Sequence, residues 1–235
     1  MTNLIQPTWP APTWIKAYTT VRDAWGNFNI PADELLETYK EKTLRTLLPL
    51  PENLIWLTQT HSSMAVEAKP ENIRSKADAS FTMHSQQVCI VLTADCLPIL
   101  ISNKQGTCVA AIHAGWRGLA NGIIEDTLAK LQQLPEELLV WLGPAIGPEQ
   151  FEVGEDVFAA FTAVCADDAV AFVPKQAGKW RANLYQLARM RLQRAGIQHI
   201  YGGQYCTYSQ PDLFFSYRRD KGHQGRMASL IWIDA

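Results

Sequence analysis

Apolar residues along the chain follow two patterns, which predict strands in some segments and helices in others. Short, nearly continuous apolar runs rich in β-branched residues are typical of buried strands. The runs that predict strands are 54–60, 88–101, 107–112, 140–142, 197–201, 204–208 and 225–233. Polar residues interrupt the run 88–101, so we expect a pair of strands there with a bend between them. We expect irregular strands and a turn in residues 1–30, and a short strand or turn at 77–82.

Four other segments place their apolar residues three or four positions apart, which is the spacing of a helix that buries one face. The predicted helices are 31–48, 119–133, 153–164 and 183–195. The first begins with Pro31 and two acids, which suit the first turn of a helix, and Gly196 ends the last. Turns are predicted at 103–106 and 175–179, and the Gly/Pro-rich loop 143–148 is of a kind that often lines pockets.

The order of the elements indicates the fold class and the number of domains. Strands and helices are mixed without strict alternation, which favours an α+β or mixed α/β fold. A chain of 235 residues has room for one large domain or two small ones. Because no internal repeat or low-complexity linker divides it, we expect one domain spanning residues 1–235.

The composition of the chain indicates which kinds of molecule it binds. Hydrophobic residues make up 47% of the chain and charged residues 19%, and the net charge of −2 gives no reason to expect nucleic acid or an acidic membrane surface as partner. The N-terminus lacks a basic start with a long apolar core, and no apolar run has membrane length, so we expect a cytoplasmic protein that acts on small molecules. Five cysteines at irregular spacing indicate reduced thiols, so a special cysteine would be a ligand or a nucleophile.

The segment 110–119 contains two candidate functional residues at the end of a predicted strand. They are His113 and Arg117, and Arg117 lies between Gly115 and Gly118 where a helix is predicted to begin. Free backbone N–H groups and the helix dipole favour anions at such a position. On these residues alone, a hydrogen-bonded core histidine is as good an interpretation as a functional one.

Three residues of metal-ligand type each follow or interrupt an apolar run: His61, Cys96 and His113. Two imidazoles and one thiolate suit Zn²⁺ and leave a fourth position for water or substrate, as in catalytic zinc sites. Asp95 is costly to bury unpaired and Pro98 cannot donate to a ladder, so the chain must bend near Cys96. The turn at 103–106 then allows Cys96 and His113 to face one another across neighbouring strands.

Five strings of the sequence occur in the same order in a known family. They are Thr58-Gln59-Thr60-His61, Thr93-Ala94-Asp95-Cys96-Leu97-Pro98, His113-Ala114-Gly115-Trp116-Arg117-Gly118, Leu142-Gly143-Pro144-Ala145-Ile146-Gly147 and Phe215-Ser216-Tyr217-Arg218-Arg219-Asp220. From about residue 54 onward, the chain closely resembles the YfiH or peptidoglycan-editing-factor family, also called laccase-domain or DUF152 proteins. The resemblance implies a single α+β domain with mixed β-sheets flanked by helices.

The resemblance also implies a cofactor and an activity. Family members bind one zinc through the residues that match His61, Cys96 and His113, and purine nucleoside phosphorolysis and adenosine deamination are assigned to them. Older polyphenol-oxidase labels and a peptidoglycan-editing role are also attached to the family. The chain departs from the family pattern near its start, where a glycine-rich loop is shortened and only Arg22 and Asn29 are kept, and at Ser62, where the family has glycine.

The implied chemistry gives roles to further residues. Zinc lowers the pKa of bound water to about 7 for attack at the purine C6, with Asp95 beside the ligand Cys96 as proton carrier. Phosphorolysis needs a clamp for phosphate, for which we expect Arg117, with Arg218 and Arg219 as further substrate contacts. Asn29 and Gln59 match the family pattern, and the resemblance implies that they also contact the substrate. Alternatively, Asp95 pins the bend and the Arg218–Arg219 pair forms a surface salt bridge.

Three other functions remain open at this point. A multicopper polyphenol oxidase needs several copper sites, and the chain has five histidines, of which His84, His199 and His223 lack comparable settings. A metal-free cysteine amidase acting on cell-wall precursors would use Cys96 as nucleophile and His113 as base, but it leaves His61 without a role. A regulatory ligand-binding protein is the non-enzymatic alternative. We therefore expect one zinc per chain, with copper as the less favoured metal.

Overall fold

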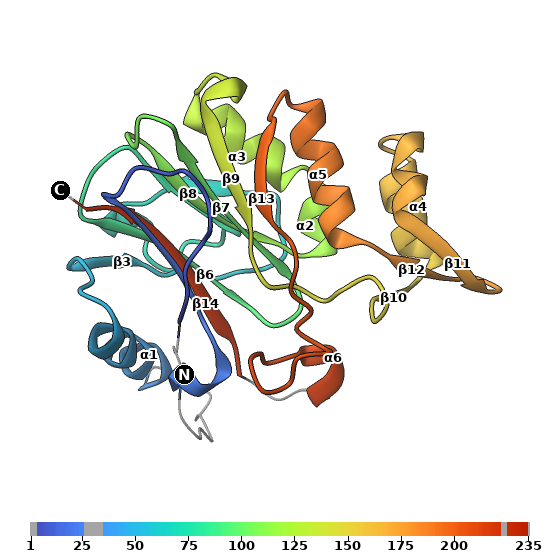
Figure 1. The fold of residues 1–235 in the computed structure, drawn as a ribbon, viewed down its shortest axis with the longest axis horizontal. Helices are drawn as coiled ribbons and strands as arrows, with labels where there is room; N and C mark the ends of the chain where they lie inside the picture. The colour runs from blue at the N-terminus through green and yellow to red at the C-terminus, as the bar shows by residue number, and fades with distance from the viewer. Residues whose placement is uncertain (1–3, 26–34, 222–224, 235) are drawn as a thin grey trace.

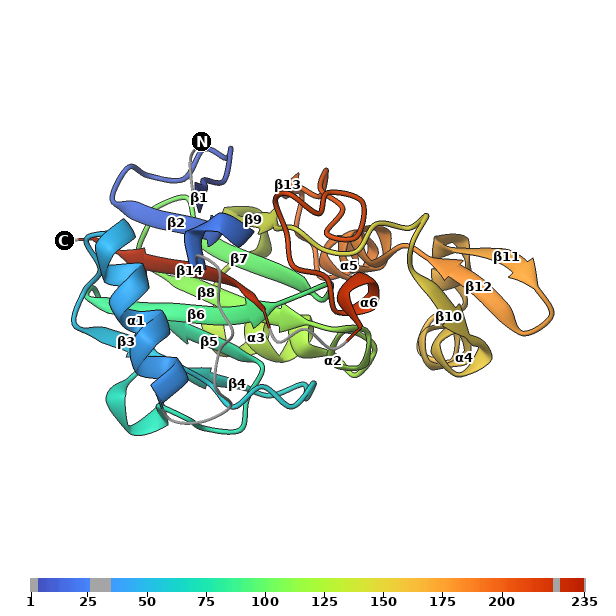
Figure 2. The same ribbon diagram turned by 90° about the horizontal axis from the view of Figure 1, so that it is seen from below.

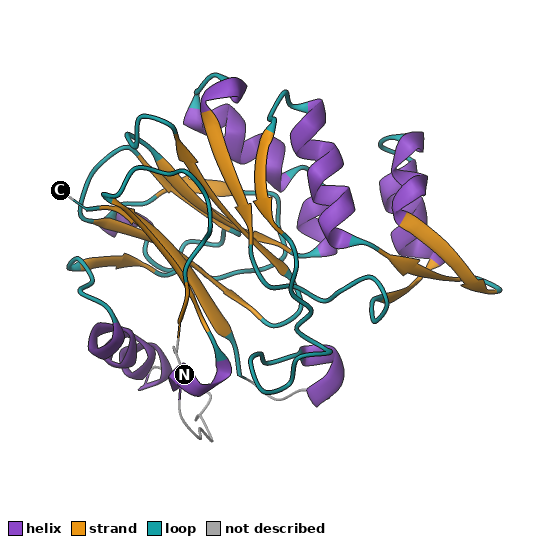
Figure 3. Ribbon diagram, in the orientation of Figure 1, coloured by secondary structure: helices purple, strands orange, loops and turns teal. Residues whose placement is uncertain are grey.

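The computed structural model describes residues 4–25, 35–221 and 225–234, and it shows an α+β fold built on three sheets. The first is a mixed five-stranded sheet in the order β1-β2-β14-β6-β3. Its strands are β1 (Leu4–Ile5), β2 (Ile15–Thr20), β14 (Met227–Ile233), β6 (Gln87–Thr93) and β3 (Asn53–Ile55). The expected fold class is therefore confirmed, and mixed sheets flanked by helices are what Figure 3 shows.

The second sheet is also mixed and has six strands in the order β13-β9-β7-β8-β5-β4. They are β13 (His199–Gly202), β9 (Leu138–Leu142), β7 (Leu97–Asn103), β8 (Val109–Ala114), β5 (Ala79–Thr82) and β4 (Ala65–Glu67). A smaller antiparallel sheet, β10-β12-β11, joins Glu152–Gly154, Lys179–Ala182 and Phe172–Gln176. Together with α4 (Glu155–Thr162), it extends away from the two larger sheets (Figures 1 and 2).

The two large sheets pack face to face, with helices on both outer sides (Figure 1). Cys89 and Val91 of β6 meet Leu100 of β7 in the core between them. On the outer face of the five-stranded sheet, α1 (Leu35–Leu47) packs Leu44 near Val88. The outer face of the other sheet is covered by helices α2 (Trp116–Ala120), α3 (Ile123–Leu131) and α5 (Leu184–Arg194).

Short helices complete the fold. They are α6 (Tyr217–Asp220) and the 3₁₀ helices η1 (Arg22–Trp25), η2 (Pro70–Asn72), η3 (Pro135–Glu137) and η4 (Ala166–Ala171). In the described ranges 4–25, 35–221 and 225–234, no helix combines the length and the apolar character needed to cross a bilayer.

Several predicted elements are confirmed in position. Helix α5 begins where expected because the Asn183 side chain accepts a hydrogen bond from the Gln186 amide, which caps the helix. The turn predicted at 175–179 joins β11 to β12, with Gly178 in the left-handed region. The run 88–101 does form two strands with a bend. However, β6 and β7 belong to different sheets, so the bend at Asp95 carries the chain from one layer to the other.

Other predicted elements are shorter or differently built. The helix expected at 119–133 is two helices, because Gly122 adopts a φ of 93° between them. The strand expected at 54–60 ends at Ile55. The helix expected at 153–164 begins only after strand β10. The strand expected at 204–208 is absent apart from one bridge, Ala145 to Cys206. The first four residues of the helix predicted at 31–48 lie outside the described residues.

Candidate metal centre

Strand register brings Cys96 and His113 to the same end of the six-stranded sheet. Strands β7 and β8 are antiparallel, with Leu97 opposite Ala114 and Pro98 opposite His113. Cys96, which directly precedes Leu97, therefore lies beside the end of β8. The juxtaposition expected from the turn at 103–106 is present in the structure.

His61 joins these two residues from the loop that follows β3. Its Nε2 lies 3.7 Å from the Sγ of Cys96, and the ligand atoms of His61, Cys96 and His113 all lie within 4.8 Å of one another. A tetrahedral zinc with ordinary Zn–N and Zn–S bonds separates its ligand atoms by about 3.4–3.6 Å. The donor set and its spacing therefore fit zinc after small side-chain adjustments.

Asp78, which the motif analysis missed, supports two of these three ligands. It is fully buried, and one of its oxygens lies 2.7 Å from Nδ1 of His113, which is also buried. Because β5 pairs with β8 so that Ala79 stands opposite Ile112, Asp78 falls opposite His113. The signal in the sequence was an acid between two alanines at the start of a predicted strand, which is a weak one without knowledge of the pairing.

The electrostatics of the cluster favour an ionised thiol. Burial alone would raise the pKa of Cys96, but hydrogen bonds and charge from His113 and His61 lower it to about 6. Burial alone would lower the pKa of His113, but hydrogen bonds with Asp78 and Cys96 raise it to about 9. For Asp78, burial is outweighed by hydrogen bonds from His113 and Ser62, which lower its pKa to about 2. A thiolate is the form of cysteine that binds metals.

The glycines of the segment 113–118 are required by close packing against the His61 loop. A Cβ atom on Gly115 would lie 2.7 Å from Cδ2 of His61 and 3.1 Å from the Cys96 sulfur. A Cβ atom on Gly118 would lie 2.7 Å from the carbonyl oxygen of Ser62. His61 itself has a φ of 61°, a backbone conformation that favours glycine and is held here by its surroundings. Small residues therefore let helix α2 approach the ligands.

The three ligands lie in a cleft of about 910 Å³, which we call the triad cleft. Apolar and aromatic side chains form part of its wall: Leu57, Leu92, Ile146, Phe151, Trp116 and Tyr217. Basic side chains come from four separate segments: Lys40, Arg117, Arg218 and Arg226. The arrangement combines a metal-type donor set with surfaces suited to an aromatic ring and an anion.

Arg117 lies in the first turn of α2, at the strand-to-helix junction expected from the sequence. Its side chain is exposed, lines the triad cleft and stacks on Trp116, with the guanidinium carbon 4.4 Å from the ring centroid. Arg218 also lines the cleft and is exposed. One of its guanidinium nitrogens donates to the carbonyl of Glu152 at 3.0 Å. Both arginines are thus placed at the cleft.

Arg219, the neighbour of Arg218, serves the loop instead. Its guanidinium donates to the carbonyls of Thr207, Tyr208 and Phe214 and pairs with Asp220. Since all three nitrogens have partners within the protein and the residue does not line the triad cleft, these contacts favour a supporting role rather than substrate binding.

Asp95 lines the triad cleft, but its carboxylate is engaged by three donors from two other segments. It accepts hydrogen bonds from the hydroxyls of Thr207 and Ser216, at 2.6 and 3.0 Å, and from the backbone N–H of Arg218 at 2.7 Å. Its φ of 91° marks the bend between β6 and β7. These contacts favour the alternative in which Asp95 pins the bend and holds the segment that carries Arg218.

Two predicted substrate contacts remain. Gln59 lines the triad cleft, but its amide exchanges two hydrogen bonds with the backbone of Leu92, at 2.7 and 2.8 Å. This side chain bonds Leu92 in place of the backbone, while the backbone of Trp56 and Thr58 bonds Arg74 and Ser75, so β3 ends at Ile55. Asn29 lies outside the described residues, so its role stays a prediction.

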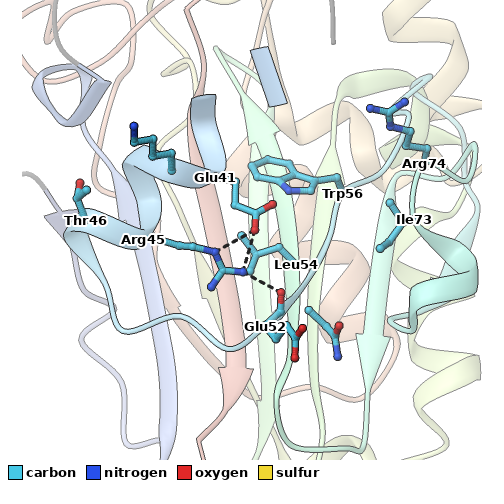
Figure 4. A pocket seen from close by; sticks show the side chains of 10 residues that line it. Glu41, Arg45, Thr46, Glu52, Leu54, Trp56, Ile73 and Arg74 are labelled. Carbon is cyan, nitrogen blue, oxygen red and sulfur yellow. Dashed lines mark hydrogen bonds and ion pairs between the residues drawn. The ribbon is translucent and has the colours of Figure 1, made fainter. Parts of the chain in front are cut away.

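A second cleft, of about 710 Å³, lies between α1 and the segments around β3 and Arg74 (Figure 4). We call it the α1 cleft. Arg45 pairs there with Glu41 and donates to the carbonyls of Leu50, Pro51 and Glu52. Among the described residues, the group that could hold a metal is in the triad cleft, not in the α1 cleft.

Comparison with known proteins places the chain in a family. A family model described as multi-copper polyphenol oxidoreductase laccase matches residues 35–234. A Haemophilus influenzae protein named purine nucleoside phosphorylase is 44% identical over 98% of this chain and 99% of its own length. The Escherichia coli K12 protein named purine nucleoside phosphorylase YfiH is also 44% identical, over 99% and 100%.

Solved structures agree with the sequence comparisons. A Neisseria meningitidis protein of family DUF152 has a TM-score of 0.91 and 40% identity, covering 99% of this chain and all of its own. Bacillus licheniformis YfiH, at 23% identity and a TM-score of 0.87, shares the fold. The chain belongs to the laccase-domain family, also known as DUF152, of which YfiH is a member.

Proposed function

We propose that the protein is a zinc-dependent purine nucleoside phosphorylase that also deaminates adenosine, acting in the cytoplasm on nucleosides of the adenosine, inosine and methylthioadenosine class. The named activity of the relatives supports an enzyme that acts on small molecules. The observation that carries the proposal is the convergence of His61, Cys96 and His113 in a cleft that also holds Arg117. A thiolate and two imidazoles suit zinc better than they suit a hard metal ion.

Different residues of the triad cleft bind the phosphate and the purine in the proposed phosphorolysis. A phosphate oxygen attacks the ribose C1′, the bond from C1′ to the purine nitrogen breaks, and the purine leaves with the bonding electrons. Arg117 holds the phosphate with a permanent charge and a fork of donors, and Arg218 adds a second guanidinium. Trp116 and Phe151 provide aromatic surface for the purine. Zinc, when bound, supplies Lewis-acid activation, which also serves hydrolytic deamination at C6.

Asp95 enters this proposal as the residue that holds Arg218 in place. A direct proton transfer by Asp95 requires its carboxylate to exchange one of three hydrogen bonds for the substrate. Gln59 forms part of the wall, since both polar ends of its amide are bonded to Leu92.

One second candidate deserves a test, because the family model is described as a multi-copper polyphenol oxidoreductase laccase. Such chemistry needs several copper ions to pass electrons to oxygen. Within ranges 4–25, 35–221 and 225–234, one group of three or more His, Cys, Asp or Glu residues has a spacing that suits a metal. His84 and His199 are not in it, and His223 lies outside those ranges.

A paired assay separates the two functions. Purified protein is analysed for zinc and copper, then incubated with inosine or adenosine with and without phosphate, and separately with phenols and oxygen. We expect about one zinc per chain, purine release that requires phosphate, and ammonia release from adenosine. Copper as the resident metal, together with phenol oxidation and no purine release, would reject the proposal and favour the oxidase.

A further inference from the structure

The buried carboxylate of Asp78 gathers hydrogen bonds from two separate parts of the metal site. Its exposed fraction is 0%, and the side chain of His113, its partner across the sheet, is 4% exposed. Its two oxygens accept from the backbone N–H groups of Thr60 (3.1 Å), His61 (3.0 Å) and Ser62 (2.6 Å) and from the Ser62 hydroxyl (2.7 Å), and one of them lies 2.7 Å from Nδ1 of His113. The four groups of residues 60–62 all donate, as an ionised carboxylate requires.

The contact with His113 decides which ring nitrogen faces the metal. Because an ionised carboxylate can only accept, Nδ1 must carry the proton, and Nε2 is then the nitrogen available as a ligand. The backbone of His113 is fixed by the same residue, since its N–H donates to the carbonyl of Asp78 at 2.7 Å. His113 is therefore held both at its backbone and at ring nitrogen Nδ1.

The contacts with residues 60–62 fix the second ligand through its backbone. Three consecutive N–H groups converge on the carboxylate, and His61 in their centre has a φ of 61°. A non-glycine residue adopts that conformation at a cost, so other contacts must compensate. The convergent hydrogen bonds supply that compensation and turn the His61 side chain toward Cys96.

We propose that Asp78 is the positioning residue that assembles the metal site, setting the ring nitrogen of His113 and the backbone of His61 with one carboxylate. Cys96 is placed independently, by the register of β7 on β8. The inference rests on the metal-binding part of the proposed function, and not on the reaction catalysed. Two ligands thus depend on a residue that touches neither metal nor substrate.

The variant Asp78→Asn tests this directly because an amide cannot satisfy both sets of donors. If the amide oxygen accepts from Thr60 and Ser62, the NH₂ group faces the N–H of His61 and Nδ1 of His113, which must then accept and place its proton on Nε2. If the amide turns over, its oxygen accepts from His61 and His113, and the NH₂ group meets the N–H groups of Thr60 and Ser62. The first orientation turns a protonated nitrogen of His113 toward the metal, and the second releases the loop that carries His61. We expect zinc affinity, measured by competition with a chelator, to fall by about 10–100-fold.

Asp168→Asn is the matched control for burial. Asp168 is also 0% exposed and pairs with Arg194 at 2.7 Å, away from the ligands. We expect this variant to lose stability while it keeps the zinc affinity of the unmodified protein. Amide hydrogen exchange in the zinc-free proteins gives a second readout: residues 60–62 should lose protection in Asp78→Asn and keep it in Asp168→Asn. Zinc affinity within twofold of the unmodified protein in folded Asp78→Asn would overturn the proposal.

If Asp78→Asn does not fold, the unmodified protein still decides the question. In its zinc-loaded form, long-range ¹H–¹⁵N correlation spectra should show a proton on Nδ1 of His113 and the metal on Nε2; the opposite arrangement overturns the proposal. A protein that binds no zinc would overturn this inference and the metal part of the proposed function together. A protein that binds zinc as described but releases no purine would reject the proposed reaction and leave the role of Asp78 standing.

Discussion

The triad cleft and the α1 cleft are of comparable size, about 910 and 710 Å³, but their polar groups are used differently. In the α1 cleft, the guanidinium of Arg45 is taken up by Glu41 and by three backbone carbonyls, so it fastens the end of α1 to the chain that follows. Behind the triad cleft, the buried Asp78 holds the backbone of His61 by a hydrogen bond. The ligand atoms of His61 and Cys96 therefore face one another in the cleft. The triad cleft therefore differs from the α1 cleft in having side-chain atoms that could bind a metal, and not in its volume.

The largest expected effect is on the triad itself. Cys96→Ala removes the sulfur ligand, and we expect the protein to lose its zinc on dialysis. Because bound zinc contributes several kcal/mol to a transition state, purine release should fall by about 10²–10³-fold or more. Elemental analysis and a phosphorolysis assay measure the two effects. Full zinc occupancy in the variant would remove Cys96 from the site.

Gly115→Ala sharpens the comparison by crowding the triad without changing a ligand. Its new Cβ would lie 2.7 Å from the His61 ring and 3.1 Å from the Cys96 sulfur, so the His61 ring must shift from its present position. We expect zinc affinity to fall by about tenfold or more, as for other changes that misplace a ligand. Gly178→Ala is the matched control, since nothing lies within 4 Å of its Cβ and it is strained only by its φ of 69°. It should bind zinc like the unmodified protein, and equal zinc affinities in both variants would contradict the packing argument.

Arg117→Lys tests the anion side of the triad cleft. Lysine keeps the charge but loses the planar fork and the stacking on Trp116, so we expect the KM for phosphate to rise by about tenfold, the effect of one lost charge-assisted hydrogen bond. The KM for the nucleoside should change much less. Kinetics with each substrate varied in turn measure both values. An unchanged KM for phosphate in both Arg117→Lys and Arg117→Ala would remove Arg117 from phosphate binding.

Asp95→Asn separates the two roles open to that residue. The amide NH₂ group would face the N–H of Arg218 or a hydroxyl, so we expect a loss of about 1–3 kcal/mol in the free energy of unfolding, with zinc retained. Turnover should change only a fewfold, chiefly through the position of Arg218. Chemical denaturation and kcat measure the two effects. A loss of about 10²–10⁴ in kcat at unchanged stability would instead make Asp95 a proton carrier.

The smallest effect on activity is expected in the α1 cleft. Arg45→Ala removes the hydrogen bonds that fasten α1, each with a net value of about 1 kcal/mol, and much of that is offset by water at this half-exposed position. We expect a lower melting temperature with unchanged zinc content and phosphorolysis. A large loss of turnover in a folded Arg45→Ala protein would show that volume was the better guide to the site.

Local sequence patterns predicted most elements and the strand pairing across the turn at 103–106, but not the pairing of strands far apart in the chain, and the site shows why. The bend at Asp95 and the helix after Asn183 follow from a proline, an acid within an apolar run and a helix cap, which act within a few residues. Asp78 acquires its role only when β5 pairs with β8, a contact made across 35 residues of chain. No local pattern encodes that pairing.

The elements that were predicted incorrectly also depend on contacts or backbone conformations that local patterns do not specify. The strand expected at 54–60 has a suitable composition, but a side chain, that of Gln59, replaces the backbone in pairing with Leu92. The helix expected at 119–133 has the right spacing on both sides of Gly122, and only the backbone conformation of that glycine divides it. The ligand triad could be predicted because each of its members ends or interrupts an apolar run. The role of Arg219 could not, because it depends on which backbone carbonyls lie near its side chain in the folded protein.

The most direct test of the account is X-ray diffraction from crystals of the purified protein, recorded on both sides of the zinc and copper absorption edges. We predict one anomalous peak that appears above the zinc edge, bonded to Nε2 of His61, Sγ of Cys96 and Nε2 of His113 at about 2.0–2.3 Å. A peak that follows the copper edge, or a zinc peak bound elsewhere while these three side chains remain unligated, would contradict the account.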